Sequence, residues 1–393
     1  MNLKAARNEI SITGAKKTDP ELLRNVFSAA STARTLSQLQ EGIQTALQRL
    51  QSMDIIKDAS IAIQPTDRGS WNVEIGLQER RFKINAGTHI APATNSLAVG
   101  TSAIFFNLFG RGESFALESA VADAQGKVAP ISLTFKKPLM GCESAVASVE
   151  LYQNSISRTL TVPLGAHKAI GFWPKVKHNW RVNGQLFSFE VGYHACLKQR
   201  LEQKDSSYWT SGISVVAQRS TLDSTILPTN GSLLKGAIDA MGLGGDYSFV
   251  KGSIYAKGHW PLGVFGLIAG ASTRIGGILS PSSSTLPLLE QFSLGGPGSL
   301  RGYQSFGGCG QGLLLGEGGL SVAFPVRDWV MPHVFLNGGI IGARGPFWWS
   351  FGAGVGISVG GAGRLEVNFA VPVGRVGLRV RDCVQVGFCL EPL

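Results

Sequence analysis

The chain has 393 residues, of which 16% are charged and 51 are glycines, and it carries a formal net charge of +10. The charged fraction lies well below the roughly 25% of ordinary soluble domains, and glycine far exceeds its usual share of about 7%. No apolar run approaches the roughly 18 residues of a transmembrane helix, which leaves a large soluble core or a membrane β-barrel.

Charge and cysteine placement narrow the function classes. The basic excess lies almost entirely after residue 80. No lysine or arginine run occurs there, so a basic lumen or loop set is as good an interpretation as binding to nucleic acid or anionic lipid.

Five scattered cysteines without a C-x-x-C pair predict free thiols. The N-terminal stretch MNLKAARNEISITG lacks an apolar segment and a cleavage site, and predicts no secretory signal peptide.

Residues 9–80 alternate between strand and helix patterns. EISIT at Glu9–Thr13 predicts a short strand, and Asp19 before Pro20 predicts a helix start. A second helix is predicted from Ser37, which fits a capping box with Gln40. The apolar residues of both helices recur at helical spacing; they are Leu22, Leu23, Val26, Phe27, Ala30, Leu39, Ile43, Ala46, Leu47, Leu50 and Met53.

Two alternating strands follow, at Ala59–Gln64 and Trp71–Leu77, with a turn of proline, aspartate and glycine between them. The order is β-α-α-β-β. It predicts a small α+β domain over residues 1–80, in which two helices cover one face of a three-stranded sheet.

From about residue 81 the helical period disappears and a period of two dominates. In RLEVNFAV, at Arg364–Val371, apolar residues alternate with arginine, glutamate, asparagine and alanine, and in Phe351–Gly360 they alternate with glycine and serine. Apolar outward faces and small or polar inward faces are typical of a transmembrane barrel. A soluble sandwich or propeller also alternates, but its outward faces would carry charge that these segments lack.

The length of this second part predicts the number of strands. Residues 82–393, at about 20 residues for each strand and its connection, supply roughly 16 strands. We therefore predict a mainly β protein with a transmembrane antiparallel barrel of about 16 strands over residues 81–393, preceded by one small α+β domain. Tryptophans near strand ends fit interfacial girdles; they are Trp173, Trp180, Trp209, Trp260, Trp329, Trp348 and Trp349.

The stretch SLGGPGSLRGYQ, at Ser293–Gln304, places one arginine among many glycines. It has neither of the usual phosphate-binding glycine spacings, and no helix is predicted after it. The glycines and the proline let a long loop fold sharply, so that Arg301 can offer its donors to a carboxylate in an enclosed place. An exposed glycine-rich hairpin is the simpler alternative.

A resemblance now becomes specific. The small α+β domain resembles a POTRA domain, and Leu294–Tyr303 matches the motif L-G-G-x-x-S-[IVL]-R-G-[FY] of the BamA-like superfamily of outer-membrane assembly barrels. A single such domain without a signal peptide resembles the mitochondrial branch, the core barrel of the sorting and assembly machinery. The C-terminal segments at 349–374 and 381–387 are similar to the last strands of that branch.

The resemblance implies an insertase without bond chemistry, and therefore not an enzyme. It would fold and insert β-barrel precursors at a lateral seam where the first and last strands meet, an edge with free main-chain groups. The partners implied are porin-type precursors, accessory assembly subunits and the lipid bilayer of the mitochondrial outer membrane, with the POTRA domain in the intermembrane space. The expected seam residues are Phe82, Ile84, Ala86, Val384, Val386, Phe388 and Leu390.

The resemblance also implies that the loop around residues 293–312 folds into the lumen. Its motif residues would be Leu300, Arg301, Gly302 and Tyr303, supported by two glycines, Gly295 and Gly296. Arg301 would pair with an inward acid, for which Glu366 and Glu317 are the candidates.

Two other function classes stay open. A protein-conducting or metabolite pore, similar to plastid import channels or porins, is the alternative. A soluble enzyme has little support, because no Ser/His/Asp set or metal-ligand spacing occurs among the dispersed histidines. We expect no metal, no cofactor and no nucleic-acid partner.

Overall fold

The structure is a computed structural model, and it describes residues 2–4, 8–66, 70–91, 96–120, 130–139, 145–157, 166–200, 207–281, 286–296, 298–303, 309–359, 363–373 and 383–389. Two compact units are distinguished. One comprises Met1–Gly87, Gly100–Ala120 and Ile131–Leu151, and the other comprises Thr88–Val99, Val121–Pro130 and Tyr152–Leu393. The domain boundary expected near residue 80 stays a prediction.

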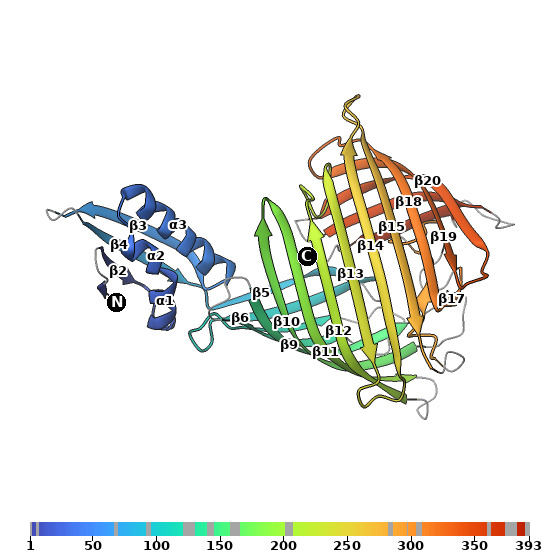
Figure 1. The fold of residues 1–393 in the computed structure, drawn as a ribbon, viewed down its shortest axis with the longest axis horizontal. Helices are drawn as coiled ribbons and strands as arrows, with labels where there is room; N and C mark the ends of the chain where they lie inside the picture. Colours follow the sequence, from blue (N-terminus) through green and yellow to red (C-terminus); the bar gives the residue numbers. More distant parts are fainter. Residues whose placement is uncertain are drawn as a thin grey trace. The chain divides into compact units, whose positions relative to one another are not determined.

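The described residues of the N-terminal segment form a small sheet and three helices, which Figure 1 shows in blue. Within its described residues the sheet has four strands in the order β1-β2-β4-β3, with β2 parallel to β4. The sequence predicted three strands and two helices. The elements are β1 (Asn2–Lys4), β2 (Glu9–Thr13), α1 (Pro20–Val26), α2 (Ser28–Thr32), α3 (Leu36–Ser52), β3 (Ile56–Pro65) and β4 (Trp71–Glu79).

The helix starts follow from capping side chains. Asp19 accepts a hydrogen bond from the Glu21 N–H and caps α1, as its sequence predicts. The cap of α3 is Thr35, which accepts from the Gln38 N–H, so the prediction of a start at Ser37 was wrong. The helix begins earlier because the Thr35 hydroxyl accepts from the Gln38 N–H, and the Gln38 side-chain oxygen in turn accepts from the Arg34 N–H at 3.0 Å.

The core of this segment is made by the apolar faces that the sequence predicts. Phe27 is fully buried, and so is Leu39. They pack with sheet residues such as Val73 and Ile75, which are also fully buried. The apolar faces of the helices and of the strands therefore pack together in one core.

Most of the chain forms one sheet that has 16 strands among the described residues. This agrees with the predicted antiparallel fold of about 16 strands. Its order is β22-β21-β20-β19-β18-β15-β14-β13-β12-β11-β10-β9-β8-β7-β6-β5. Sequence neighbours pair except that β15 pairs with β18, because β16 and β17 form a separate two-stranded hairpin between them in the chain.

The strands of this part have the following bounds. They are β5 (Phe82–Ala91), β6 (Ser96–Phe106), β7 (Ser114–Ala120), β8 (Ile131–Pro138), β9 (Ala145–Ser157), β10 (Ala166–Val182), β11 (Gln185–Arg200), β12 (Ser207–Ser220), β13 (Gly231–Met241), β14 (Phe249–Pro261), β15 (Ile268–Leu279), β16 (Phe292–Ser293), β17 (Gln311–Gly312), β18 (Leu314–Ala323), β19 (Val330–Ile341), β20 (Phe347–Val359), β21 (Gly363–Pro372) and β22 (Val384–Cys389).

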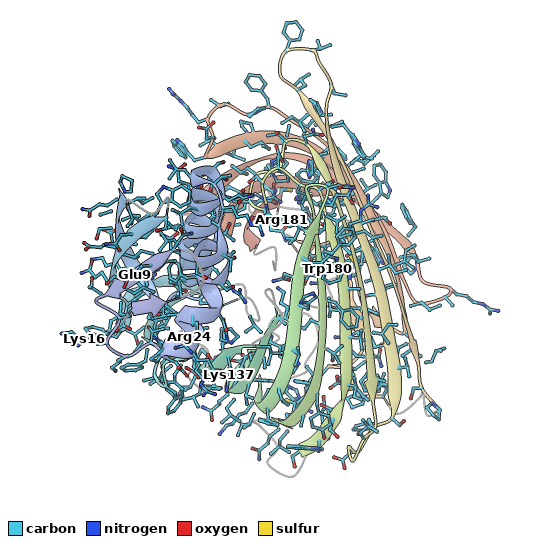
Figure 2. All side chains as sticks on the ribbon, turned by 60° about the vertical axis from the view of Figure 1, so that its left-hand side comes forward. Glu9, Lys16, Arg24, Lys137, Trp180 and Arg181 are labelled. Atoms are coloured by element: carbon cyan, nitrogen blue, oxygen red, sulfur yellow. The ribbon has the colours of Figure 1, made fainter. Side chains whose placement is uncertain are left out.

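The two faces of the sheet differ as the alternation predicts. On β21, Val367 and Phe369 are exposed, whereas Glu366 and Asn368 are buried. Trp180 of β10, labelled in Figure 2, is exposed and stacks on Phe187 of β11 with ring centroids 5.7 Å apart. An exposed apolar face beside a buried polar face is the inverse of a soluble sheet.

Two of the tryptophans assigned to girdles lie elsewhere, and that assignment was wrong for them. Trp173 packs edge-on against His194, and Trp348 packs against Tyr303 in a buried cluster. Adjacent strand residues point to opposite faces, so Trp348 and Trp349 cannot both face outward. Among the described residues, no helix is long and apolar enough to cross a membrane.

Candidate functional site

The loop between β15 and β18 is packed against the inward face of the sheet. Its hairpin pairs Phe292 with Gly312 and Ser293 with Gln311. Its apolar side chains form a buried cluster with residues of the neighbouring strands. The cluster contains Phe249, Ile278, Leu286, Phe292, Leu294, Leu300, Tyr303, Cys309, Leu315 and Ile341. The loop is therefore enclosed, and the exposed-hairpin alternative does not hold for its described residues.

Glycines shape the turn before the arginine. Gly295 and Gly296 have φ values of 121° and 115°, which favour glycine. The Gly296 N–H donates to the Leu300 carbonyl at 3.1 Å, and the Ser299 N–H donates to the Gly296 carbonyl at 3.1 Å. This closed turn buries Leu294 and Leu300 completely and presents the next residue, Arg301, to the sheet.

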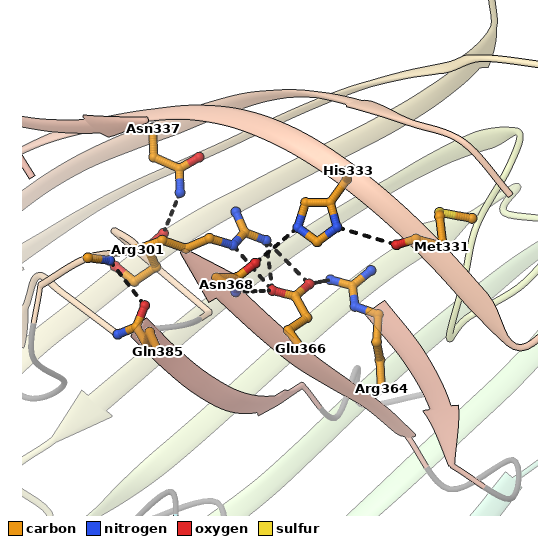
Figure 3. A network of polar contacts seen from close by, with 10 residues as sticks. Arg301, Met331, His333, Asn337, Arg364, Glu366, Asn368 and Gln385 are labelled. Atoms are coloured by element: carbon orange, nitrogen blue, oxygen red, sulfur yellow. Dashed lines mark hydrogen bonds and ion pairs between the residues drawn. The ribbon is translucent and has the colours of Figure 1, made fainter. Parts of the chain in front are cut away.

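Arg301 forms a two-pronged ion pair with Glu366 of β21 (Figure 3). Its Nε lies 3.2 Å from Glu366 Oε2, and its Nη2 lies 3.0 Å from Oε2 and 3.3 Å from Oε1. The Glu366 side chain is 1% exposed and that of Arg301 is 18% exposed. The guanidinium also lies over the Phe335 ring, 4.8 Å from its centroid, an arrangement that lysine would reproduce poorly.

Glu366 is held by two further donors on its own strand, β21. Arg364 Nη2 forms a second ion pair with Glu366 Oε1, and Asn368 Nδ2 donates to Oε2 at 3.1 Å. Asn368 Oδ1 in turn lies 3.1 Å from His333 Nε2 of β19. A buried carboxylate needs such partners. Glu366 is therefore held ionised and in position to pair with Arg301.

Glu317, the other candidate acid, has a different role in the structure. Its Oε2 accepts a hydrogen bond from the Ser299 hydroxyl, and its Oε1 lies 3.7 Å from Arg274 Nη1 of β15. Glu317 therefore holds the turn before the arginine, while Glu366 holds the arginine itself.

The residues after the arginine bind the last strands. The Gly302 N–H donates to Gln385 Oε1 of β22 at 3.1 Å, and Gln385 Nε2 donates to the Tyr303 carbonyl at 3.0 Å. The Tyr303 hydroxyl lies 3.1 Å from the carbonyl oxygens of both Trp349 and Val373. The sequence analysis did not predict the role of Gln385.

A second polar attachment, which sequence reasoning missed, lies at the start of the loop. Glu290 forms an ion pair with Lys198 of β11 and accepts a hydrogen bond from the Tyr208 hydroxyl of β12 at 3.1 Å. Lys251 of β14 donates to the Glu290 carbonyl at 3.0 Å and lies over the Phe292 ring. The partners are 39 to 92 residues away, so no local signal could have found them.

Glycines on the sheet make room for side chains of the loop and of β21. A Cβ on Gly276 would lie 2.4 Å from the Phe292 ring, and one on Gly339 would lie 2.9 Å from Leu294 Cδ1. A Cβ on Gly354 would lie 2.0 Å from Asn368 Oδ1. A side chain at any of these positions would force the neighbouring side chain to shift, which gives a packing reason for glycine on these strands.

A cavity of about 520 Å³ adjoins the loop tip, and Arg301, Glu317 and Glu366 line part of it. Its other charged lining residues are Lys235, Lys257, Arg274 and Arg364, so its wall is basic. No group of three or more potential metal ligands occurs among the described residues. The arrangement can hold a loop in place and attract negative charge.

The predicted seam residues lie on the two strands at the ends of the sheet order. Phe82 and Ile84 of β5 are 64% and 70% exposed, and Val384 and Val386 of β22 are 51% and 55% exposed. Ala86 and Phe388 belong to these strands, but their side chains, like the whole of Leu390, lie outside the described residues. Their role at a seam stays a prediction.

Most of the chain matches one protein family. The Omp85 superfamily domain matches residues 107–388. The sorting and assembly machinery component 50 homolog B of Xenopus laevis is 26% identical over 425 aligned positions, covering 96% of this chain and 88% of that protein. The human homolog has the same identity and coverage.

Solved structures have the same fold at lower identity. BamA from Haemophilus ducreyi lacking POTRA domains 1–3 has a TM-score of 0.71 and 14% identity, covering 96% of this chain and 82% of that structure. CdiB from Escherichia coli has a TM-score of 0.61 and 15% identity, covering 96% and 74%. At this identity the likeness concerns the fold alone.

Proposed function

This chain belongs to the Omp85 superfamily, and from that membership we propose that it inserts β-barrel precursor proteins into the mitochondrial outer membrane. The similarity to sorting and assembly machinery component 50 homologs over 96% of the chain supports an assembly role. The resemblance of the C-terminal segments to the mitochondrial branch supports the choice of membrane. The N-terminal segment would lie on the intermembrane-space side, and accessory assembly subunits would join the chain in a complex.

In this proposal the precursor enters at a lateral seam between β5 and β22. These strands stand at the ends of the sheet order, and an edge strand has main-chain N–H and C=O groups to offer. Within hydrocarbon each unsatisfied group costs several kcal/mol. A precursor strand that pairs with such an edge satisfies both chains by β-augmentation. No covalent bond is made or broken.

The observation that carries the proposal is the attachment of the loop to the strands at one end of the sheet. Arg301 binds Glu366 of β21, and Gly302 binds Gln385 of β22. The loop thereby holds both β21 and β22. An edge strand whose position is fixed in this way can serve as the template for an incoming strand at the seam.

Cysteine crosslinking of a bound precursor tests this function. Single cysteines replace Phe82, Ile84, Val384 or Val386 in a chain whose native Cys383 and Cys389, which flank or end β22, are changed to serine. A radiolabelled porin-type precursor with single cysteines along its last strand is imported into isolated mitochondria and oxidised.

We expect crosslinks at alternating precursor positions, in one register with each edge. If a chain with one cysteine on each edge forms the internal disulfide and the precursor crosslinks to neither edge, the barrel is a closed pore and the insertase proposal fails. A matched control has the cysteine at Ile254 on β14, an exposed position within the sheet, where no precursor crosslink is expected.

A further inference from the structure

The cavity of about 520 Å³ beside the loop tip has more positive than negative charge on its wall. Five lysine or arginine side chains line it, against two glutamates. Glu366 pairs with Arg301 and Arg364 (Figure 3), and Glu317 lies 3.7 Å from Arg274. Both acids are therefore already engaged with arginines. A cavity with an excess of one sign of charge concentrates ions of the opposite sign.

Three of the basic residues surround one tyrosine on three adjacent strands. Tyr255 of β14 lies opposite Lys235 of β13 on one side and opposite Arg274 of β15 on the other. Lys257 follows Tyr255 by two residues and therefore points to the same face of the sheet. Ser272 of β15 lies opposite Lys257. All five residues line the cavity, so three cationic groups and two hydroxyls are presented to it from a rigid sheet.

Lys235 is the residue of this set that the fold itself does not use. It forms no ion pair or hydrogen bond among the described residues. Glu190 of β11 pairs with Lys175, at 3.7 Å, and not with Lys235. The side chain of Lys235 is half-buried on the inward face of the sheet. An ammonium group that is partly removed from water gains most from an anion beside it.

Another part of the cavity wall is apolar. Leu227, from the turn between β12 and β13, packs in a buried cluster with Ile268, Ala323 and Met331. Leu227, Met331 and Leu233 also line the cavity. Its volume lies within the range of small-molecule sites, roughly 300–1,000 Å³. The size and the mixed lining therefore suit a small molecule with an anionic group.

We propose that this cavity binds a small molecule that carries a diphosphate group, with Lys235, Lys257 and Arg274 as its contacts. Ammonium and guanidinium groups are common partners of phosphate oxygens. The backbones of β13 and β15 lie two strand spacings apart, roughly 10 Å, and two linked phosphates cover that width better than one. The ligand is either free inorganic diphosphate or a nucleoside diphosphate, which share this chemistry. The inference goes beyond precursor insertion and does not depend on it.

Equilibrium binding to the purified full chain tests the site. Radiolabelled inorganic diphosphate is titrated at about 0.15 M salt, where charge attraction is screened beyond about 8 Å. The variant is Lys235→Gln, and the control is Arg219→Gln, which removes the same charge. Arg219 is exposed. Its neighbour Gln218 lies opposite Lys235, so Arg219 points to the other face of the sheet.

We expect one saturable site per chain, and binding to Lys235→Gln that is at least about tenfold weaker, as the loss of a hydrogen bond to a charged group implies. Arg219→Gln should bind diphosphate as the native chain does. The site would be overturned if the native chain showed no saturable binding, or if the two variants had equal affinities.

Competition with unlabelled anions identifies the source of the diphosphate group. Stronger competition by ADP than by inorganic diphosphate would identify a nucleotide, whose ring system would contact the apolar part of the wall. Weaker competition by ADP would identify the free anion. Orthophosphate should compete less than either. If orthophosphate competed as strongly as diphosphate, the assignment of a diphosphate group would be wrong.

A second measurement uses the native chain, so a folding defect of a variant cannot imitate the result. Acetylation of Lys235 by an amine-reactive reagent is followed by mass spectrometry. With diphosphate at about ten times its Kd, the rate at Lys235 should fall about tenfold, in proportion to the unoccupied fraction. Lys83, an exposed lysine on β5, should react at an unchanged rate. An unchanged rate at Lys235 while diphosphate is bound would place the anion elsewhere and overturn the site.

Discussion

Glu366 receives two guanidinium groups and one amide although its side chain is only 1% exposed. The loop arginine supplies one of these guanidinium groups, and Arg364 of the same strand supplies the other. Removal of one partner from a buried ion pair costs about 3–5 kcal/mol, largely because the remaining charge stays buried. Here Arg364 stays beside Glu366 when Arg301 is removed, so the remaining charge is still paired and the cost is smaller. Removal of Arg301 therefore weakens mainly the docking of the loop.

We predict that Arg301→Ala releases the loop and lowers precursor insertion, while the N-terminal domain stays folded. Arg301→Lys should have an intermediate effect, because lysine keeps the charge but not the two-pronged geometry. The labelling rate of Cys309 measures docking, because this thiol is buried in the loop's apolar cluster. We expect the labelling rate of Cys309 to rise at least about tenfold in Arg301→Ala, which corresponds to a loss of about 1.4 kcal/mol or more in the free energy of loop docking.

Arg327→Ala provides the control, since Arg327 is an exposed arginine in the turn between β18 and β19. It should change neither the labelling of Cys309 nor insertion. Unchanged labelling and normal insertion in Arg301→Ala would remove the role assigned to the arginine.

At the scale of elements, a turn between β6 and β7 joins the N-terminal domain through a chain of hydrogen bonds within one compact unit. Asn107 Nδ2 donates to Thr18 Oγ1 at 2.9 Å, and the Thr18 hydroxyl donates to Glu79 Oε1 at 2.6 Å. The main-chain N–H groups of Lys17 and Thr18 also donate to this carboxylate. The joint connects β4, the loop before α1 and the turn between β6 and β7.

The Glu79 carboxyl makes this joint sensitive to acid. Partial burial by itself raises the pKa of Glu79, but the hydrogen bonds from Thr18 and Lys17 outweigh it and hold the pKa below its usual 4.5. Because the pKa of Glu79 is lower in the folded state, its ionised carboxylate stabilises the fold above pH 4.5. This stabilisation is lost as the pH falls through the pKa of the folded state. We predict that the hydrogen-bonded Glu79 carboxylate contributes about 1 kcal/mol to the free energy of unfolding at neutral pH. Its partial exposure to water keeps this contribution small.

Hydrogen exchange of the Thr18 amide between pH 2 and 6, corrected for the intrinsic rate, measures this effect. Its protection should fall with acidification in the native chain. In Glu79→Gln it should be lower at neutral pH and independent of pH over this range. Identical profiles in the two proteins would mean that the carboxylate does not hold the joint.

The elements also indicate what the sequence could and could not predict. The faces of β21 follow directly from alternation, because a strand's side-chain period is fixed by its backbone. Whether Glu366 or Glu317 would meet Arg301 depended on how the loop folds, which periodicity does not describe. Glu290 and Asn107 were missed for a related reason, since each sits outside a periodic segment and meets partners far away in the sequence.

At the scale of the whole molecule, one sheet contains 16 strands in sequence order among the described residues, with β5 and β22 at the ends of that order. Composition and period predict such a sheet because few other folds combine so little charge with exposed apolar faces. The ends of the order are where strand addition is chemically simplest. The central claim is therefore that the seam between these two strands must open for insertion.

A reversible lock of the seam tests this claim most directly. Cysteines at Phe82 or Ile84 are combined with cysteines at Val384 or Val386, with Cys383 and Cys389 changed to serine, and the pair that oxidises to a disulfide is reconstituted in liposomes. The control joins Ile254 and Ile275, exposed register partners on β14 and β15. We expect the seam lock to stop insertion of a β-barrel precursor, reductant to restore it and the control lock to have no effect. Insertion at the same rate through a locked and a reduced seam would contradict the account.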